Sequence, residues 1–484
     1  MIRSMTSFFA NIPEDRISWR DRRLRSAWLV IALAAVVAVI ALPRTMINGD
    51  EYLYAGEARM LLHGRLLPID GDPIPGALVA SDSEGARYPP GWPALLSIPA
   101  LFGFRSMFLA TLATHLVAGA VLARMLVRRR IAASLVAAYL FHPVFWSFSR
   151  TLMSDIPNAA VLLLAMDAWE QNRPTVAGAS VAYSFAMRLA NIISISGIAL
   201  ATFSKWRSQP RLFASLILGA VLGSGAVLLV NFIKFGHPFN SSYGDAAFKV
   251  LNGRMLWPNF CLYTLGLLLI PPFPLACLIV RPREADRWCL MAVPVLLFFF
   301  FYSYHDSSRR FLETALGGQR LIIPAHVAMM IGTARIWGEI PIPKLPVVAP
   351  IAGVLAALVE YRAVKHLDDR YGAVTALLAG CNPGRIAFNR NASRVALSAD
   401  ARAYYVIDGR EPTDLGDVIV VAPSSPTNKP IERAANYRFP PALRERSDTC
   451  QKVGEFFIFD LSGRCPRVGQ FCDLSNTEPG RATN

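Results

Sequence analysis

The sequence predicts an all-α polytopic membrane protein that carries a small extramembrane α/β domain at its C-terminal end. Three observations predict this fold class. Hydrophobic residues make up 54% of the 484 residues and charged residues 17%, whereas soluble domains carry about 25% charged residues. The hydrophobic residues form blocks of about 20, the length of a helix that crosses a bilayer. Residues 361–484 instead contain short strand-like runs between turns.

The positive charge of the chain fits a membrane protein. The net charge is +15, and most arginines lie between the apolar blocks, where basic residues set the topology and contact anionic headgroups. No nucleic-acid-binding motif accompanies this charge. We therefore expect membrane lipids, and no nucleic acid, among the partners.

The first apolar block, Ser26–Leu42, follows a basic segment at residues 1–25 that we expect to be cytoplasmic. The block ends without a convincing small-residue cleavage site, so we interpret it as a retained span and not as a signal peptide. It opens a transmembrane domain, residues 26–360, that includes a large outer loop at 43–105. Further single spans are expected at Met107–Val127, Ile131–Phe148, Ile156–Glu170, Leu212–Ile233, Phe260–Val280, Trp288–Tyr302, Leu321–Trp337 and Val347–Val359.

One apolar segment, Val176–Phe203, is long for a single span and is interrupted by Arg188 and Asn191. We interpret it as two short helices, at 176–188 and 190–203, which gives about eleven spans in total. The basic clusters between spans then lie on the cytoplasmic side, as the positive-inside rule requires. A single span would place the later clusters on the wrong side. The outer side receives the loops 43–105, 149–155, 234–258 and 303–320 and the C-terminal tail.

The tail, residues 361–484, is predicted to be a small α/β domain on the periplasmic or extracellular side. The apolar runs 418–422 and 455–459 are typical of short strands. Cys450 and Cys465 flank the second run and could link across it. Four tail cysteines are compatible with two disulfides in an oxidising compartment: Cys381, Cys450, Cys465 and Cys472.

Two adjacent carboxylates, Asp50 and Glu51, stand just after the first span. Asp50, Tyr54 and Glu57 recur at helical spacing and Gly64 supplies a helix stop, so we expect an amphipathic helix at the membrane surface. An acid at a helix start can serve simply to cap free N–H groups and to complement the helix dipole. It could instead do chemistry on a substrate that arrives through the lipid. The residues alone leave both interpretations open.

A second motif places Arg87 and Tyr88 directly before two prolines, Pro89 and Pro90. The prolines favour an extended entry into a following helix, so both side chains are held beside that entry. The Arg87 guanidinium could bind a phosphate there. Alternatively the motif is an interfacial anchor, because Arg, Tyr and Trp are common at headgroup depth.

Four further polar residues are candidates. Asp155 precedes a span, so Ser154 or Asp155 could be its cap. Arg188 lies in an apolar segment, where a charge costs about 2.5–3.5 kcal/mol and therefore usually faces a partner or a cavity. His305 and Asp306 could bind a metal, but one His and one Asp make a weak site, so we favour a surface role. Arg320 opens a late span and could bind an anionic headgroup.

The order of these motifs resembles that of the GT-C integral-membrane glycosyltransferases, in the branch that contains the protein O-mannosyltransferases and the lipid A aminoarabinose transferases. The likeness covers the order of elements across residues 26–340. Each motif is short, so the resemblance lies in their order and topology. The motifs are Asp50-Glu-Tyr-Leu-Tyr-Ala, Leu61-Leu-x-Gly64, Arg87-Tyr-Pro-Pro, Ser154-Asp-Ile-Pro and Gln319-Arg-Leu-Ile-Ile-Pro324.

The resemblance implies a sugar donor linked to polyprenyl phosphate and an inverting transfer to a hydroxyl. Asp50 matches the family's catalytic acidic residue, the general base toward the acceptor, and Asp155 matches a second acidic position. Arg87, with Tyr88 beside it, occupies the place of a basic residue that contacts the donor phosphate. Arg320 could hold the leaving phosphate. Supporting roles are open for Glu51, Arg188 and His305.

These roles agree with what the chemistry needs. A departing lipid phosphate needs a cation and an acceptor hydroxyl needs a base. We therefore expect a glycosyltransferase of the cell inner membrane that acts on a lipid, glycan or protein acceptor at the periplasmic or extracellular face. No cofactor is required by the pattern, although Asp50, Glu51 and Asp155 could hold a divalent metal ion.

Two alternatives remain open. A transporter or flippase of a lipid-linked glycan would also bury charges among helices. It would need an opening on each side of the membrane, whereas the acidic loops of this sequence are concentrated on one side. The second alternative is a non-catalytic scaffold that uses the tail as a binding module.

Overall fold

The computed structural model divides the chain into two compact units. The helical unit comprises residues 1–42, 89–92 and 110–361, and the sheet unit comprises residues 43–88, 93–109 and 362–484. The residues that the structure describes are 18–43, 46, 51–66, 88–188, 190–239, 251–302, 318–339, 371–381, 385–388, 403–406, 417–421, 443, 447–453, 456–466 and 470–471.

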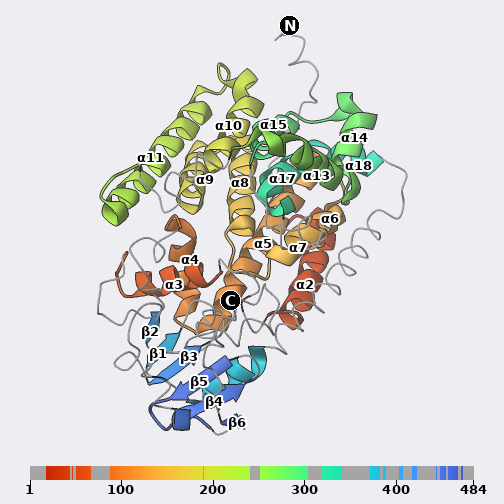
Figure 1. The fold of residues 1–484 in the computed structure, drawn as a ribbon. Helices are drawn as coiled ribbons and strands as arrows, with labels where there is room; N and C mark the ends of the chain where they lie inside the picture. Colours follow the sequence, from red (N-terminus) through yellow and green to blue (C-terminus); the bar gives the residue numbers. More distant parts are fainter. Residues whose placement is uncertain are drawn as a thin grey trace. The chain divides into compact units, whose positions relative to one another are not determined.

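Helices dominate the chain, as the composition predicts (Figure 1). Three helices in the described residues are long and apolar enough to cross a membrane, and a bent pair could form a fourth span. The expected total of about eleven spans stays a prediction, and Val347–Val359 lies outside the described residues. The main helices are α2 (Arg25–Ile40), α5 (Phe104–Arg128), α8 (Asp155–Glu170), α9 (Pro174–Met187), α10 (Asn191–Thr202), α11 (Pro210–Phe235), α13 (Leu256–Leu269), α14 (Pro274–Val280), α15 (Cys289–Phe300), α17 (Ile323–Gly332) and α18 (Ala334–Glu339).

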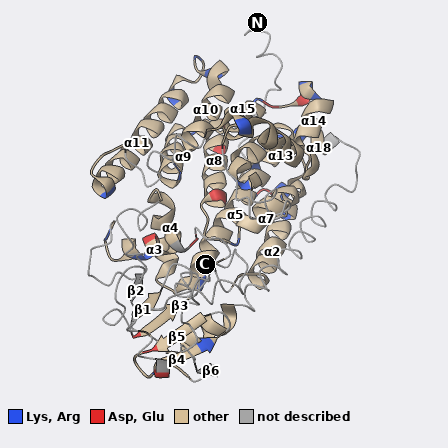
Figure 2. Ribbon diagram, in the orientation of Figure 1, with Lys and Arg blue, Asp and Glu red and all other residues tan. Residues whose placement is uncertain are grey.

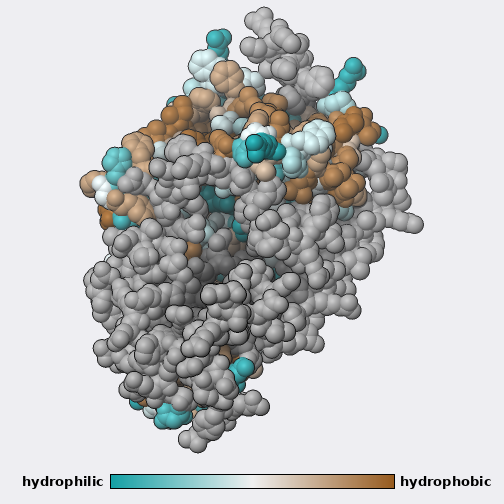
Figure 3. Space-filling view, in the orientation of Figure 1, coloured by the Kyte–Doolittle hydropathy of each residue, from teal (hydrophilic) through white to brown (hydrophobic). Residues whose placement is uncertain are grey.

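Helix α11 has the features of a lipid-facing span. Figure 2 shows its ribbon tan over most of its length, with basic residues only near its two ends. Leu218, Val221 and Leu222 are each more than half exposed. Figure 3 shows hydrophobic residues, in brown, gathered on the visible surface of the helical unit. Apolar side chains exposed in this way are stable in contact with lipid tails.

The backbones of α9 and α11 approach closely because small residues line their contact. A Cβ atom added at Gly219 would collide with the carbonyl oxygen of Gly178, and one added at Gly223 would lie 2.5 Å from the carbonyl oxygen of Ala182. Gly219 and Gly223 are one helical turn apart on α11, as are Gly178 and Ala182 on α9. This is the small-xxx-small pattern that brings membrane helices together.

Gly219→Val is expected to destabilise the helical unit by about 3 kcal/mol, because its side chain has no space against α9. Gly225→Val is the matched control on the same helix, since no atom lies within 4 Å of a Cβ added there. The check is the thermal unfolding midpoint of each variant in detergent. Equal midpoints for the two variants would refute close packing at Gly219.

Two segments that were expected to be single spans are broken. Within residues 131–148, α6 (Ala137–Leu140) is followed by α7 (Pro143–Phe148), because Pro143 has no N–H to donate and favours an extended backbone before it. Within residues 260–280, α13 and α14 bend by 82°, with two prolines between them. Both segments are apolar enough to be predicted as single spans, although their prolines interrupt the helix.

The prediction of two helices between residues 176 and 203 is confirmed. Helix α9 ends at Met187 and α10 begins at Asn191. Between them Arg188 adopts an extended conformation, with φ −153° and ψ 125°. A charged residue therefore stands at a break between two apolar helices, where it can reach a partner.

Within its described residues, the tail forms a six-stranded sheet in the order β2-β1-β3-β5-β4-β6. Strands β2, β1 and β3 run parallel, and β3, β5, β4 and β6 pair antiparallel. The predicted strands near 418–422 and 455–459 are confirmed as β3 and β5. The bounds are β1 (Arg385–Phe388), β2 (Ala403–Val406), β3 (Val418–Val421), β4 (Cys450–Val453), β5 (Phe456–Asp460) and β6 (Gln470–Phe471). The sheet unit also contains α3 (Glu51–Leu62) and most of α4 (Gly91–Ala100).

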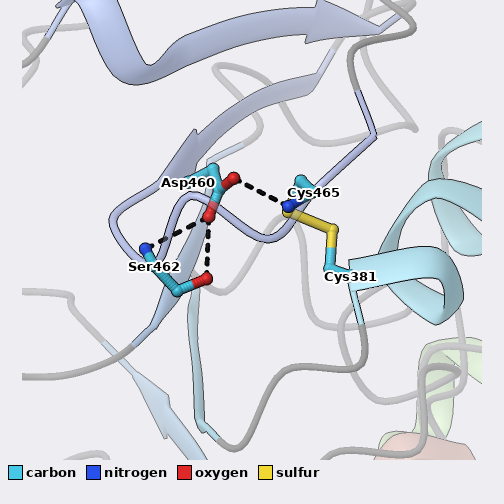
Figure 4. Close-up of a disulfide and its surroundings, with 4 residues drawn as sticks. All are labelled: Cys381, Asp460, Ser462 and Cys465. Carbon is cyan, nitrogen blue, oxygen red and sulfur yellow. Dashed lines mark hydrogen bonds between the residues drawn. A yellow bond between two sulfur atoms is a disulfide. The ribbon is translucent and has the colours of Figure 1, made fainter.

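A disulfide joins Cys381, at the end of the helix Tyr371–Cys381, to Cys465 after β5 (Figure 4). The Asp460 carboxylate shapes the intervening loop, because it accepts hydrogen bonds from the N–H groups of Ser462, at 3.1 Å, and Cys465, at 2.8 Å. The expected link between Cys450 and Cys465 is therefore wrong. Cys450 is buried in the core of the sheet and is itself disulfide-bonded. Cys472 lies outside the described residues.

Candidate functional site

An ion pair joins Asp155, the first residue of α8, to Arg188 in the break between α9 and α10. The Arg188 guanidinium donates to the Asp155 carboxylate through Nη1. The side chain of Asp155 is 2% exposed and that of Arg188 is 25% exposed. Helix capping was one interpretation of Ser154 and Asp155, but Ser154 at the N-cap makes no capping side-chain hydrogen bond. Arg188 thus has the charged partner that its place in an apolar segment predicts.

A second polar contact lies one turn further along α8. Asn158 and Asn191 exchange two amide hydrogen bonds, at 2.9 Å and 2.6 Å. Asn191 also donates to the carbonyl oxygen of Ser184 in the last turn of α9. These bonds hold the broken end of α9 against the start of α8. They fix the position from which Arg188 reaches Asp155.

The Arg87-Tyr-Pro-Pro motif leads into the same part of the helical unit. The Trp92 indole N–H donates to the carbonyl oxygen of Leu152 at 2.7 Å, three residues before Asp155. The Tyr183 hydroxyl donates to the carbonyl oxygen of Gly91 at 2.6 Å. Gly91 also packs so closely on Ala186 that a Cβ there would lie 2.6 Å from its backbone. Gly91 and Trp92, the two residues after this motif, are therefore anchored beside both partners of the ion pair.

Two more arginines connect the segment that precedes Asp155 to other elements, Arg320 from outside it and Arg150 from within it. Arg320 begins a 3-10 helix, Arg320–Ile322, and its guanidinium lies 5.9 Å from the ring centroid of Phe148. Arg150 is buried and donates to the carbonyl oxygen of Ala41 at 2.9 Å, so it joins the end of the first span to this segment. Arg150 was not among the predicted site residues, and its only sequence signal was its place at the start of the Asp155 loop.

In the sheet unit, α3 holds the residue that follows Arg87. The backbone N–H of Tyr88 donates to the Glu57 carboxylate at 2.7 Å. The rings of Tyr54 and Tyr88 stack with their centroids 4.1 Å apart. Both Glu51 and Glu57 are buried. Sequence reasoning assigned no role to Glu57, although its helical spacing from Tyr54 was visible.

Three predicted site residues lie outside the described residues: Asp50, Arg87 and His305. Asp50 and Arg87 are each the chain neighbour of a described residue, Glu51 and Tyr88. Among the described residues, no three His, Cys, Asp or Glu side chains form a group that could hold a metal ion. A divalent metal therefore stays a prediction that depends on residues beyond the described ranges.

The fold has known counterparts among solved structures. No protein-family model matches the sequence, and no curated protein matches it. The crystal structure of ArnT from Cupriavidus metallidurans in the apo state is 15% identical with a TM-score of 0.55, and the match covers 82% of this chain and 92% of that one. The structure of ArnT bound to undecaprenyl phosphate is 13% identical with a TM-score of 0.57, covering 82% and 94%. The chain therefore shares the fold of these two structures, a mostly helical polytopic membrane fold.

Proposed function

We propose that the protein is a membrane glycosyltransferase that moves a sugar from a polyprenyl-phosphate donor to a hydroxyl acceptor at the outer face of the inner membrane. The observation that carries the proposal is that three residues from distant parts of the chain meet at Asp155 and the segment before it. Trp92 and Arg320 contact that segment, and Arg188 binds Asp155 itself. Undecaprenyl phosphate bound to a protein of the same fold supports a polyprenyl-phosphate donor.

The proposed reaction needs one base and at least one cation. Asp50 takes the proton of the acceptor hydroxyl, whose oxygen attacks the anomeric carbon as the bond from that carbon to the phosphate oxygen breaks. Attack on the face opposite the phosphate inverts the anomeric centre. Arg87 and Arg320 stabilise the negative charge of the departing polyprenyl phosphate.

Asp155 has a different task in this proposal. Its carboxylate is buried and already bound by Arg188, so it is poorly placed to take a proton from an acceptor. We assign Asp155 as a positioning residue, which holds Arg188 and the start of α8 in one arrangement. A quarter of the Arg188 side chain is exposed, and an exposed guanidinium can attract a substrate anion.

The direct test is turnover by the purified protein in lipid vesicles that contain sugars linked to undecaprenyl phosphate. Transfer releases undecaprenyl phosphate in proportion to the glycosylated acceptor, and both can be measured by mass spectrometry. A flippase would instead move the donor across the bilayer with its sugar–phosphate bond intact. Movement of the donor without any release of undecaprenyl phosphate would contradict the proposal.

Arg87→Ala is expected to raise the KM for the donor about 10- to 100-fold, because a charge-assisted hydrogen bond is worth about 1.5–3 kcal/mol. The KM for the acceptor should change little. Arg105→Ala is the matched control, since Arg105 is an exposed arginine in the first turn of α5, at the end of the predicted outer loop. A donor KM that Arg87→Ala leaves unchanged would remove Arg87 from the phosphate site.

A further inference from the structure

A second cluster of charged side chains lies at the end of α8 opposite to Asp155. Helix α8 has 16 residues, so the two ends are separated by about 22 Å at 1.5 Å per residue. We call this second set the arginine cluster: Arg124, Arg128, Arg129, Asp167, Glu170, Asp286 and Arg287. Its members come from the end of α5, the end of α8 and the segment before α15.

Each carboxylate of the cluster is paired with at least one arginine. Glu170 accepts from Arg128 at 2.7 Å, from Arg129, and from the Trp288 indole N–H at 2.7 Å. Asp167 binds Arg124 and Arg128, and it also accepts from the Gln171 amide at 2.6 Å. Asp286 lies 3.4 Å from Arg129. Within the part of the chain that the structure describes, one carboxylate oxygen of the cluster, Asp167 Oδ1, lies 2.6 Å from Arg128 Nη2 without forming a hydrogen bond, so the cluster offers at most one further acceptor.

The guanidinium groups, in contrast, have more N–H donors than the carboxylates of the cluster can accept. The cluster has four arginines against three carboxylates, and the positive charge of Arg173 also acts on Arg124 and Arg128. Five buried N–H positions have no acceptor within the part of the chain that the structure describes: Arg124 Nε, Arg128 Nε and Nη1, Arg129 Nε and Arg287 Nε. A buried donor without a partner costs about 1–3 kcal/mol, so several such donors together indicate an anionic acceptor.

The position of the cluster identifies the kind of anion. Arg128 ends α5, a helix long and apolar enough to cross a membrane, so the cluster lies at the depth of lipid headgroups. Arg130 and Arg173 are exposed beside it and extend the positive surface outward. Guanidinium groups bind phosphate with paired hydrogen bonds, and basic sites between helix ends hold anionic headgroups.

We propose that the arginine cluster binds the phosphate of an anionic membrane lipid, at the membrane face opposite to the Asp155–Arg188 pair. The lipid completes a network that joins α5, α8 and the start of α15. Its phosphate supplies oxygen acceptors to the unpaired N–H groups and offsets the excess positive charge. The proposal does not depend on the glycosyltransferase reaction, because the two sites lie at opposite ends of α8.

Arg287→Gln tests this site because it removes an arginine of the cluster and leaves the ion pairs described above in place. Arg287 lies over the Trp288 ring, 5.7 Å from its centroid, and forms none of the cluster's ion pairs described above. We expect phosphatidylglycerol to raise the thermal unfolding midpoint of the wild type by several degrees over phosphatidylcholine, by mass-action stabilisation of the folded state. Arg287→Gln should lose at least half of that shift. Arg283→Gln, which removes an exposed charge from the same loop, should keep it.

Two further arms identify the source of the phosphate. Native mass spectrometry of the wild type should show retained phosphatidylglycerol over phosphatidylcholine of the same chain length, which tests the site even where Arg287→Gln does not fold. Inorganic phosphate at matched concentration should reproduce little of the shift, and an equal shift would overturn a lipid as the source. Equal phosphatidylglycerol shifts in the wild type and Arg287→Gln would overturn the site.

Discussion

Asp50→Asn is expected to lower sugar transfer about 10²- to 10⁴-fold, the range that a general base contributes. The amide has nearly the size of the carboxylate but cannot take the proton of the acceptor hydroxyl. The measurement is the release of undecaprenyl phosphate in vesicles, per folded molecule. The donor KM should change less than kcat, because the proposed base acts on the acceptor and the arginines bind the phosphate.

The control for Asp50→Asn must remove one carboxylate without touching the proposed site. Glu284→Gln does so, because Glu284 is a partly exposed residue paired with Arg281 at 3.4 Å. Both variants should unfold at nearly the wild-type temperature. Transfer by Asp50→Asn at the rate of Glu284→Gln would show that another group takes the proton, and Glu51 would be the next candidate.

The membrane fold could be predicted from the sequence because its main signal is local. A block of apolar residues specifies a membrane helix wherever it stands in the chain. The break at Arg188 was also predictable, since a charge within an apolar segment needs a partner and the basic loops fix the number of spans around it. The strands β3 and β5 were predictable from their continuous apolar runs.

The contacts that build the candidate site could not be predicted, because they join residues far apart in the chain. From the sequence, Asp155 can be interpreted as a helix cap. Only the fold shows that its partner is Arg188, 33 residues later. The bond from Arg150 to Ala41 spans 109 residues. The disulfide pairing could not be predicted for the same reason, since Cys381 and Cys465 are 84 residues apart in the chain. Periodicity describes the face of an element but not the element opposite to it.

The Asp155–Arg188 pair should show strong coupling in a double-mutant cycle. Arg188→Met leaves a carboxylate that is 2% exposed without its cation, and Asp155→Leu leaves the guanidinium without its anion. Each is expected to cost about 2–4 kcal/mol, somewhat less than for a fully buried pair because a quarter of the Arg188 side chain is exposed. The double variant should recover much of this loss, since it removes both buried charges.

The same cycle separates stability from function. The partly exposed pair Arg281 and Glu284 is the matched control, and its coupling energy should be about 0–1 kcal/mol. If the buried pair only stabilises the fold, the double variant regains transfer together with stability. If the pair also positions Arg188 for a substrate anion, as we propose, the double variant regains stability but stays inactive. A stable and active double variant would therefore exclude both residues from the site, whatever the coupling energy.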